Sequence, residues 1–262
     1  MDKAERLLEK LRACGSLAVG LSGGVDSAML AKAAVLALGD KAVAITASSE
    51  LLPQAEKEDA IRCAELIGIR HQIIEAHDLD LPEVAQNGKE RCYYCKKHRF
   101  QKIISWAAEH GYRYVADGSN ADDAGDYRPG ERAVRELHVL SPLAECGFTK
   151  KDIREQAKAW GIPLWSKPSA ACLASRVAYG IPLTPERLSR IDQAENLLRQ
   201  YINGQLRLRD HGELARIELM PEDFEAFWAH RGELAQGIKA LGYAYVTLDL
   251  FGYRMGSTNE VI

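Results

Sequence analysis

Apolar and polar positions follow two different periods in the first part of the chain, and these predict buried strands separated by amphipathic helices. Short apolar runs predict strands at 16–21, 42–46, 71–75 and 112–116. Apolar residues at helical spacing predict helices at 3–13, 25–38, 53–67, 93–109 and 149–160, the last with Thr149 as its N-cap. Strands that alternate with helices in this way indicate an α/β fold with a doubly wound parallel sheet.

Two segments show neither period. Residues 119–136 are polar, and we expect a long functional loop there. Residues 163–183 are rich in Pro, Ser and Gly and mark a boundary. After this boundary the pattern predicts helices at 186–201 and 221–240 and strands at 205–209, 215–219 and 243–250. We therefore expect a larger α/β domain at 1–162 and a smaller α+β domain at 163–262.

Composition and charge exclude some classes of function. The chain has 262 residues, 47% of them hydrophobic, with a net charge of -3. Without a basic excess we expect no nucleic-acid partner. Without a run of 18 apolar residues we expect no membrane span. The N-terminus is charged and lacks an apolar signal core, so we expect a cytoplasmic location.

A glycine-rich motif, Ser22-Gly23-Gly24-Val25-Asp26-Ser27, lies between the first predicted strand and the next helix. Glycines allow close approach of the backbone to phosphates, and N–H groups at a helix N-terminus bind anions. The Ser22 and Ser27 hydroxyls add donors. The Gly-Lys-Ser/Thr ending of a Walker loop is missing. An unliganded turn is the alternative, but the full motif favours a nucleotide site.

The motif resembles the S-G-G-x-D-S pattern of the PP-loop superfamily, which includes asparagine, GMP and NAD synthetases. The resemblance implies cleavage of ATP at its α-phosphate, giving an adenylated substrate and pyrophosphate, with Asp26 positioning Mg²⁺. It also implies nucleotide contacts near Ser48 and Gly118. Both residues follow predicted strands, and ligands bind at the carboxyl ends of strands in such sheets. For Asp122 and Asp123, a role at this site and a solvated acidic turn are both open.

Six cysteines in a cytosolic chain do not indicate a disulfide framework. Cys92 and Cys95 form a C-x-x-C motif, and Cys172 lies in the irregular segment. These three thiolates could hold a 4Fe-4S cluster with an open iron that delivers sulfide. Zinc bound with His98 and an unmetallated C-x-x-C are the alternatives. Cys14 and Cys63 lie in predicted helices, and we expect them to be buried.

The later motifs resemble a narrower family, the LarE sulfur transferases that mature the nickel-pincer nucleotide cofactor of lactate racemase. The resemblance covers nearly the whole chain and includes Asp126–Gly130, Cys172 to Gly180, Ala215–Leu219 and Tyr245–Leu250. It implies that ATP adenylates a carboxylate of pyridinium-3,5-dicarboxylate mononucleotide. Sulfur then displaces AMP and leaves a thiocarboxylate. The smaller domain is implied to bind this substrate and to carry out sulfur transfer.

The family has two sulfur sources, a sacrificed cysteine that becomes dehydroalanine and a three-cysteine 4Fe-4S cluster. Cys92, Cys95 and Cys172 resemble the cluster branch. Ungapped matching places the sacrificial cysteine at Ala171, one position before Cys172. The cluster is therefore the expected cofactor, supplied by sulfide or another sulfur donor.

The resemblance also implies further roles. Arg207 and Arg209 match arginines at the substrate phosphate; their alternate positions put both on one strand face, and a solvated outer face is the alternative. Arg176 and Arg254 are candidates for the substrate carboxylates. Candidate ligands of a divalent metal are Glu195 and Glu218, with a third acid among Glu222, Asp223 and Glu225. A homo-oligomer, a hexamer, is implied as well.

Two other functions are compatible with part of these sequence motifs. A tRNA-thiolating enzyme has the same loop and cysteines, but the negative net charge speaks against it. An ATP-binding regulator with a zinc site and no turnover belongs to a different class. Release of pyrophosphate in the presence of the pyridinium substrate discriminates the regulator from an adenylating enzyme.

Overall fold

The computed structural model describes residues 2–123, 129–168 and 171–254, and the chain divides into two units. Unit 1 comprises Met1–Asp78 and Glu90–Ala170, and unit 2 comprises Leu79–Lys89 and Ala171–Ile262. The second unit thus contains a segment from the first third of the chain in addition to the C-terminal part. Periodicity could not show this segment, because it is too short for a period to be visible.

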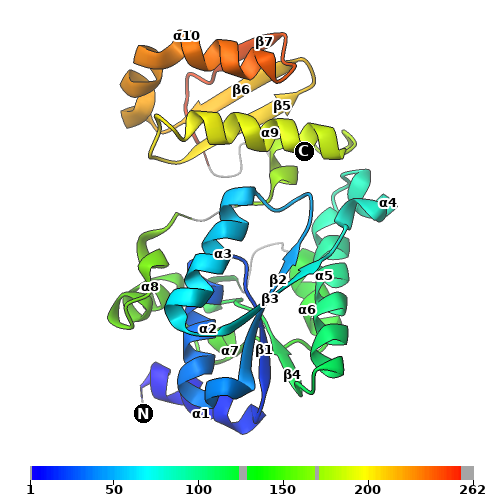
Figure 1. Ribbon diagram of the computed structural model, residues 1–262, viewed down its shortest axis with the longest axis vertical. Coiled ribbons are helices and arrows are strands. Elements are labelled where there is room, and N and C mark those ends of the chain that lie inside the picture. Colours follow the sequence, from blue (N-terminus) through cyan, green and yellow to red (C-terminus); the bar gives the residue numbers. More distant parts are fainter. Residues whose placement is uncertain (1, 124–128, 169–170, 255–262) are drawn as a thin grey trace. The chain divides into compact units, whose positions relative to one another are not determined.

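The sheet of unit 1 has four parallel strands in the order β3-β2-β1-β4 (Figure 1). The strands are β1 (Leu17–Gly20), β2 (Ala42–Ser48), β3 (Arg70–Glu75) and β4 (Tyr114–Ala116). Each prediction of a strand here is confirmed, although β4 is shorter than expected. The central strands β1 and β2 are apolar on both faces, as a sheet covered by helices requires.

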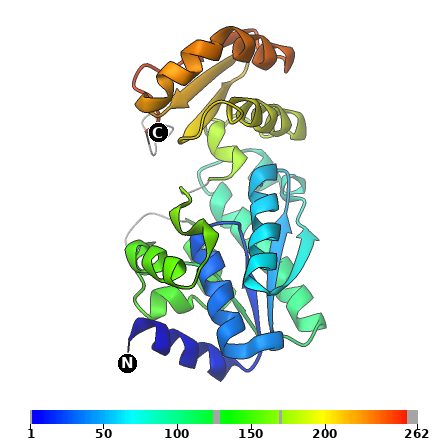
Figure 2. The ribbon, with the colours of Figure 1, turned by 60° about the vertical axis from the view of Figure 1, so that its left-hand side comes forward.

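Helices cover both faces of this sheet (Figures 1 and 2). Leu7, Met29 and Phe148 belong to the core on one face, and Phe100 and Ile103 to the core on the other. The helices of the first face are α1 (Lys3–Cys14), α2 (Val25–Leu38), α3 (Gln54–Ile67), α7 (Pro142–Glu145) and α8 (Lys150–Ala159). Those of the second face are α5 (Arg91–Glu109) and α6 (Pro129–Glu136). The predicted Thr149 cap of α8 is confirmed, because its hydroxyl accepts from Asp152 N–H in a capping box.

The expectation of a loop throughout 119–136 is wrong, because α6 begins at Pro129. This helix buries Ala133 and Val134 beside α5. It contains too few apolar residues for a period to be visible in the sequence. Of the Asp126–Gly130 motif, residues 126–128 lie outside the described residues.

Unit 2 contains a three-stranded sheet in the order β5-β6-β7. The strands β5 (Leu206–His211) and β6 (Leu214–Leu219) are antiparallel, and β7 (Tyr245–Leu248) runs parallel to β6. The helices α9 (Pro185–Leu198) and α10 (Phe224–Ala240) pack with this sheet. The predicted α+β composition is therefore confirmed.

The segment 79–89 carries the short helix α4 (Pro82–Ala85) and is anchored within unit 2 through Asn87. Asn87 is fully buried, and its Nδ2 donates to Ala178 O (2.9 Å) and Ile181 O (3.0 Å). The backbone adds bonds from Gly180 N to Asn87 O and from Leu183 N to Ala85 O. The segment therefore holds the chain that follows Cys172.

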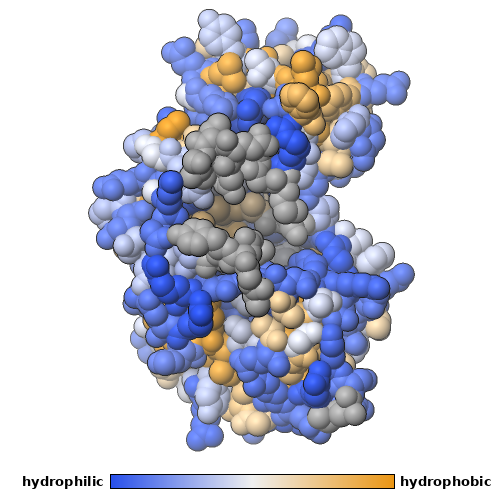
Figure 3. Space-filling model, turned by 180° about the vertical axis from the view of Figure 1, so that it is seen from behind, coloured by the Kyte–Doolittle hydropathy of each residue, from blue (hydrophilic) through white to orange (hydrophobic). Residues whose placement is uncertain are grey.

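The face shown in Figure 3 is mostly hydrophilic, with scattered apolar groups. The large exposed apolar side chains of unit 2 are Trp228, Tyr245, Leu250 and Phe251. Across the part of the chain that the structure describes, no helix combines the length and the apolar character needed to cross a membrane.

Candidate functional sites

The glycine-rich loop follows β1, which lies between β2 and β4, at the point where the strand order reverses. Ser27 Oγ accepts from Ser22 N (3.2 Å) and donates to Gly24 O (3.0 Å). Gly24 is the N-cap of α2, and no side chain caps this helix among the described residues. The first-turn amides of α2 are therefore placed to bind an anion.

Two glycines make this geometry possible. Gly23 has φ +80°, and a Cβ on it would lie 2.5 Å from Glu56 O. A Cβ on Gly118 would lie 2.9 Å from Ser27 N. Only glycine therefore fits at either position, and Gly118 allows the turn after β4 to lie against the loop.

Asp26 lies in the first turn of α2 and is held by two residues that the motif did not reveal. Lys150 Nζ donates to Asp26 Oδ1 (2.6 Å), and Asn120 Nδ2 to Asp26 Oδ2 (3.3 Å). Lys150 directly follows the Thr149 cap of α8. Lys150 therefore brings an ammonium group to the edge of the glycine-rich loop.

A second lysine binds the loop itself. Lys167 Nζ donates to Gly23 O (3.0 Å) and forms ion pairs with Glu56 (2.8 Å) and Asp59 (2.6 Å). Burial opposes ionisation of Asp59, but the hydrogen bonds from Lys167 and Arg62 lower its pKa overall. Lys167 thus ties the loop to α3. The sequence did not predict this contact, because Lys167 lies far from Gly23 along the chain.

Polar residues gather at the ends of the neighbouring strands. Ser48 Oγ, at the end of β2, accepts from Lys57 Nζ (3.0 Å). Asp117, at the end of β4, is buried and pairs with Lys96 Nζ (2.9 Å). Burial opposes ionisation of Asp117, but Lys96 and the hydroxyls of Ser119 and Ser141 lower its pKa overall.

The two acids of the turn after β4 accept backbone bonds. Asp122 Oδ2 accepts from Lys150 N (2.7 Å), and Asp123 Oδ2 from Asn120 N (2.9 Å). They therefore shape the turn that carries Asn120 to Asp26.

Cys92 and Cys95 lie near the N-terminus of α5, three residues apart and hence on one face. Cys92 is exposed and accepts from Arg91 Nη2 (3.8 Å). Cys95 is half-buried, and its thiol donates to Asp78 Oδ2 (3.6 Å). Asp78 also binds Arg99, which donates to Ser49 Oγ (2.6 Å). The thiol of Cys92 is therefore open to solvent, whereas the buried carboxylate of Asp78 engages the thiol of Cys95.

The other cysteines of unit 1 are buried, and His98, the candidate zinc ligand, lies against a backbone carbonyl. Cys14 and Cys63 are buried, as expected, and Cys146 is buried too. Burial raises the pKa of Cys63 to about 11. His98 Nε2 lies 2.6 Å from Ala76 O. Within 2–123, 129–168 and 171–254, no three His, Cys, Asp or Glu side chains converge on a common point.

Cys172 lies in unit 2 as the N-cap of the short 3₁₀ helix η5 (Leu173–Arg176), and its side chain is half-buried. Arg176 is 2% exposed and binds Glu195 through two hydrogen bonds, of 2.9 and 2.8 Å. Burial opposes ionisation of Glu195, but Arg176 lowers its pKa overall. Arg176 therefore lies next to Cys172 in a buried ion pair.

The alternative that Arg207 and Arg209 occupy a solvated face is wrong, because both are buried on β5. Arg209 pairs with Glu218 (2.8 Å) and donates to Ser175 O (2.9 Å). Arg207 Nη1 donates to Leu206 O (2.6 Å), and burial together with the nearby charge of Arg176 lowers its pKa. Arg209 therefore has its carboxylate partner within unit 2, as a buried cation requires.

The two glutamates predicted for a divalent metal are already bound. Glu195 accepts from Arg176 and from Leu208 N (3.0 Å), and Glu218 accepts from Arg209 and Arg216. Their oxygens therefore do not fit a metal ion in this arrangement. Glu222 and Asp223 form a short turn before α10, Glu225 lies in its first turn, and Arg254 faces Asp249 (3.6 Å).

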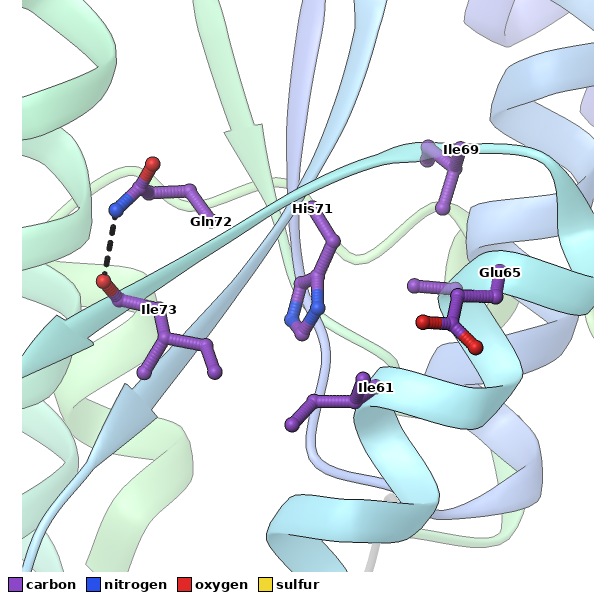
Figure 4. Close-up of a pocket in the computed structure, with 7 residues that line it drawn as sticks. Ile61, Glu65, Ile69, His71, Gln72 and Ile73 are labelled. Atoms are coloured by element: carbon purple, nitrogen blue, oxygen red, sulfur yellow. Dashed lines mark hydrogen bonds between the residues drawn. The ribbon is translucent and has the colours of Figure 1, made fainter.

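A surface cleft of about 510 Å³ lies between α3 and the edge strand β3 (Figure 4). His71 points from β3 toward α3, where Ile61 and Glu65 lie. His71 Nε2 lies 2.8 Å from Thr46 Oγ1, which donates to Leu21 O just before the loop. None of the predicted site residues lines this cleft.

Some known proteins are similar to only part of this chain, and others are similar to nearly all of it. The NAD synthase family matches residues 3–98, which include the glycine-rich loop. An NH(3)-dependent NAD(+) synthetase of Archaeoglobus fulgidus is 40% identical over 44% of this chain and 46% of its own length. An uncharacterized protein of Synechocystis sp. is 42% identical over 100% of this chain and 98% of its own length.

The most informative relative carries an activity in its name. The pyridinium-3,5-bisthiocarboxylic acid mononucleotide synthase of Lactiplantibacillus plantarum is 33% identical over 99% of this chain and 95% of its own length. The matched region covers both units. The chain therefore belongs to the LarE family of ATP-dependent sulfurtransferases within the PP-loop superfamily.

Proposed function

We propose that this chain converts the carboxylates of pyridinium-3,5-dicarboxylate mononucleotide to thiocarboxylates at the expense of ATP. The observation that carries the proposal is the full-length similarity to a synthase named for the bisthiocarboxylic acid product. The loop in unit 1 and the buried arginines in unit 2 supply the two binding chemistries that such a reaction needs.

The first step is adenylation in unit 1. A substrate carboxylate oxygen attacks the α-phosphorus of ATP, the bond to the bridging oxygen breaks, and pyrophosphate leaves with the electron pair. The amides of α2 and the ammonium group of Lys150 bind the departing charge, and Lys167 holds the loop in place. Asp26, at the edge of the loop, is the residue that would hold Mg²⁺ together with phosphate oxygens.

Substrate recognition belongs to unit 2. We assign Arg207 and Arg209 to the substrate phosphate, because guanidinium forks bind phosphate in two-point fashion. Arg209 would exchange its hydrogen bonds to Glu218 for bonds to the phosphate oxygens. Arg254 is our candidate for a substrate carboxylate. In the second step sulfur attacks the acyl carbon, and AMP leaves with the electron pair of the broken carbon–oxygen bond.

We assign the sulfur source to Cys92, Cys95 and Cys172. The thiol pair on α5 fits an iron–sulfur centre by its donor chemistry and its spacing. A 4Fe-4S cluster, when bound, supplies an open iron for sulfide. Zinc at these thiols and a sacrificed Cys172 are the alternatives that the experiments must separate.

The division of labour can be tested with ATP and the pyridinium substrate. Asp26→Asn should abolish pyrophosphate release, because the carboxylate at the loop is lost. Cys172→Ala should keep pyrophosphate release and lose thiocarboxylate formation. Asp40→Asn, at an exposed carboxylate of the same unit, is the control. If wild-type protein releases no pyrophosphate with this substrate, the proposed function is wrong.

The sulfur source needs its own measurement. Anaerobically purified protein should contain iron, and Cys92→Ala and Cys95→Ala should each lose it, whereas Cys14→Ala should keep it. The intact mass should stay constant through turnover. A loss of about 34 Da per chain would show conversion of cysteine to dehydroalanine and so favour the sacrificial route. Zinc in place of iron in active protein would remove the cluster from the proposal.

A further inference from the structure

We propose that Arg176 and Glu195 form a positioning clamp for the backbone of Cys172, rather than ligands for the substrate and a metal. The inference rests on the proposed role of Cys172 in sulfur transfer. It concerns contacts within unit 2, each of which joins residues in 171–254.

The guanidinium of Arg176 is divided between two tasks. Its Nε and Nη2 bind the two carboxylate oxygens of Glu195, at 2.9 and 2.8 Å. Its Nη1 donates to Ala171 O (2.6 Å) and Cys172 O (3.0 Å) and lies 3.1 Å from Ser175 Oγ. Guanidinium has five N–H donors in a fixed plane, and these contacts engage all three of its nitrogens. A substrate carboxylate would have to displace Glu195 or the Cys172 backbone.

The carbonyl of Cys172 is the centre of this arrangement. It accepts from Arg176 Nη1, from Ser175 Oγ (2.8 Å) and from Ser175 N (3.0 Å). The side chain of the same residue is only half-buried. The fold thus fixes the backbone of Cys172 firmly and keeps its thiol accessible, which is what a group that must meet a reacting carbon requires.

Glu195 connects the clamp to the rest of unit 2. It lies on α9, is 2% exposed and accepts from Leu208 N of β5 (3.0 Å). The clamp therefore links α9, β5 and the Cys172 segment through one buried carboxylate. A metal ion on Glu195 would compete with Arg176 for these oxygens and would leave a buried guanidinium without its carboxylate partner.

The test compares Arg176→Gln with Arg190→Gln in the full-length protein. Arg190 forms an ion pair with Asp210 (2.6 Å) in the same unit and stacks on Tyr243, and its hydrogen bonds within the described residues go to Asp210, Gly212 and Gly242 rather than to 171–176. Both variants lose a guanidinium and its ion pair, so the two should lose similar stability. Only Arg176→Gln should free the Cys172 segment.

The first measurement is local and independent of sulfur transfer. In metal-free protein, Arg176→Gln should change the rate of Cys172 alkylation several-fold and speed hydrogen exchange at 173–176. Arg190→Gln should leave both at the wild-type values. Unchanged alkylation and exchange in Arg176→Gln would overturn the clamp. The buried Cys14, Cys63 and Cys146 report in the same mass spectra whether unit 1 stays folded.

The second measurement is kinetic. Arg176→Gln should lower kcat for thiocarboxylate formation by about 10- to 100-fold and leave pyrophosphate release within about twofold. Ethylguanidinium should restore part of the activity of Arg176→Ala. If instead KM for the pyridinium substrate rises and kcat and alkylation stay unchanged, Arg176 is a substrate ligand and the clamp is wrong.

A third arm addresses the metal assignment of Glu195. Mn²⁺ binding to ATP-free protein should be the same in wild type and Glu195→Gln; loss of a bound ion in the variant would restore the metal role and overturn the clamp. Failure of the proposed function looks different. If Cys172→Ala still forms thiocarboxylate, Cys172 is not the sulfur-transfer residue, but the exchange rates at 173–176 in Arg176→Gln still report on the clamp.

Discussion

At the scale of single residues, the nucleotide loop depends on backbone conformations that side chains resist. Gly23 combines φ +80° with a neighbour, Glu56 O, only 2.5 Å from the place of a Cβ. Gly68 has a similar φ of +76° at the end of α3, with open space around it. An alanine at Gly68 would be destabilised by its backbone conformation alone. An alanine at Gly23 would be destabilised by its conformation and also by the steric clash with Glu56 O.

We predict that Gly68→Ala lowers the free energy of unfolding by about 1–2 kcal/mol, the cost of a left-handed residue with a Cβ. Gly23→Ala should lower it further and should also stop pyrophosphate release, because the loop must move away from Glu56. Urea unfolding and a pyrophosphate assay on both variants check this. Equal stability losses, or full activity of Gly23→Ala, would contradict the geometry of the loop.

Asp117 gives a prediction for acid pH. Its pKa is lowered in the fold, so its contribution to stability is fully present above the ordinary aspartate pKa of about 3.9. That contribution is lost as the pH falls through the lower pKa of the folded state. Asp117→Asn should therefore lower the free energy of unfolding by about 1–3 kcal/mol at neutral pH. The difference from wild type should shrink below about pH 4.

The control for this experiment is Glu155→Gln. Glu155 faces Lys151 at 3.9 Å on an exposed helix surface, where an ion pair contributes little. Its difference from wild type should stay within about 0.5 kcal/mol at every pH. A difference between Asp117→Asn and wild type that is independent of pH would show that the charge of Asp117 does not matter.

Residues of the site were predictable where they were contiguous or followed a strand. The loop from Ser22 to Ser27 is one motif, and Gly118 follows β4 directly. Lys150 and Lys167 were missed, because their contacts with the loop join residues more than 100 positions apart. The partner of Arg176 was also invisible, since no short-range pattern pairs it with Glu195.

At the scale of elements, periodicity predicted the strands and long helices and failed at short ones. The helices α4, α6 and α7 were missed, because each has eight residues or fewer and buries at most three side chains. Their positions are set by partners elsewhere in the fold. For α4 the partner is the segment after Cys172, which Asn87 holds by its side-chain amide.

We predict that Asn87→Gly weakens this attachment. Glycine tolerates the native φ of +56°, so the variant isolates the loss of the amide donor. The free energy of unfolding of unit 2 should fall by about 1–3 kcal/mol. Asn87→Asp should cost more, because a buried carboxylate would face the carbonyl oxygens of Ala178 and Ile181. Hydrogen exchange at 177–183 measures the effect.

An exposed asparagine in the same unit provides the control. Asn203→Gly should change stability by no more than about 0.5 kcal/mol and leave exchange at 177–183 unchanged. If Asn87→Gly exchanges at the wild-type rate, the amide contacts do not hold this segment.

At the scale of the whole molecule, the chain crosses between the two units three times, after Asp78, after Lys89 and before Ala171. A cut at the sequence-predicted boundary between 162 and 163 would leave residues 79–89 attached to the wrong fragment. We therefore predict that residues 171–262 alone do not fold cooperatively. The fragment lacks the Asn87 amide, the Gly180–Asn87 and Leu183–Ala85 bonds, and the packing of Val84, which is fully buried.

The matched control is a joined fragment in which a flexible Gly-Ser linker connects 79–89 to 171–262. It restores those contacts at a modest entropic cost, because lengthening a flexible loop adds only about 0.6 kcal/mol per doubling. We expect a sigmoidal thermal transition by circular dichroism for the joined fragment and a weak, gradual change for 171–262 alone. Small domains have little stability to lose, so a few missing hydrogen bonds and one buried valine decide between the two outcomes. Equally cooperative transitions of both fragments would mean that the segment 79–89 packs on unit 2 but does not stabilise unit 2.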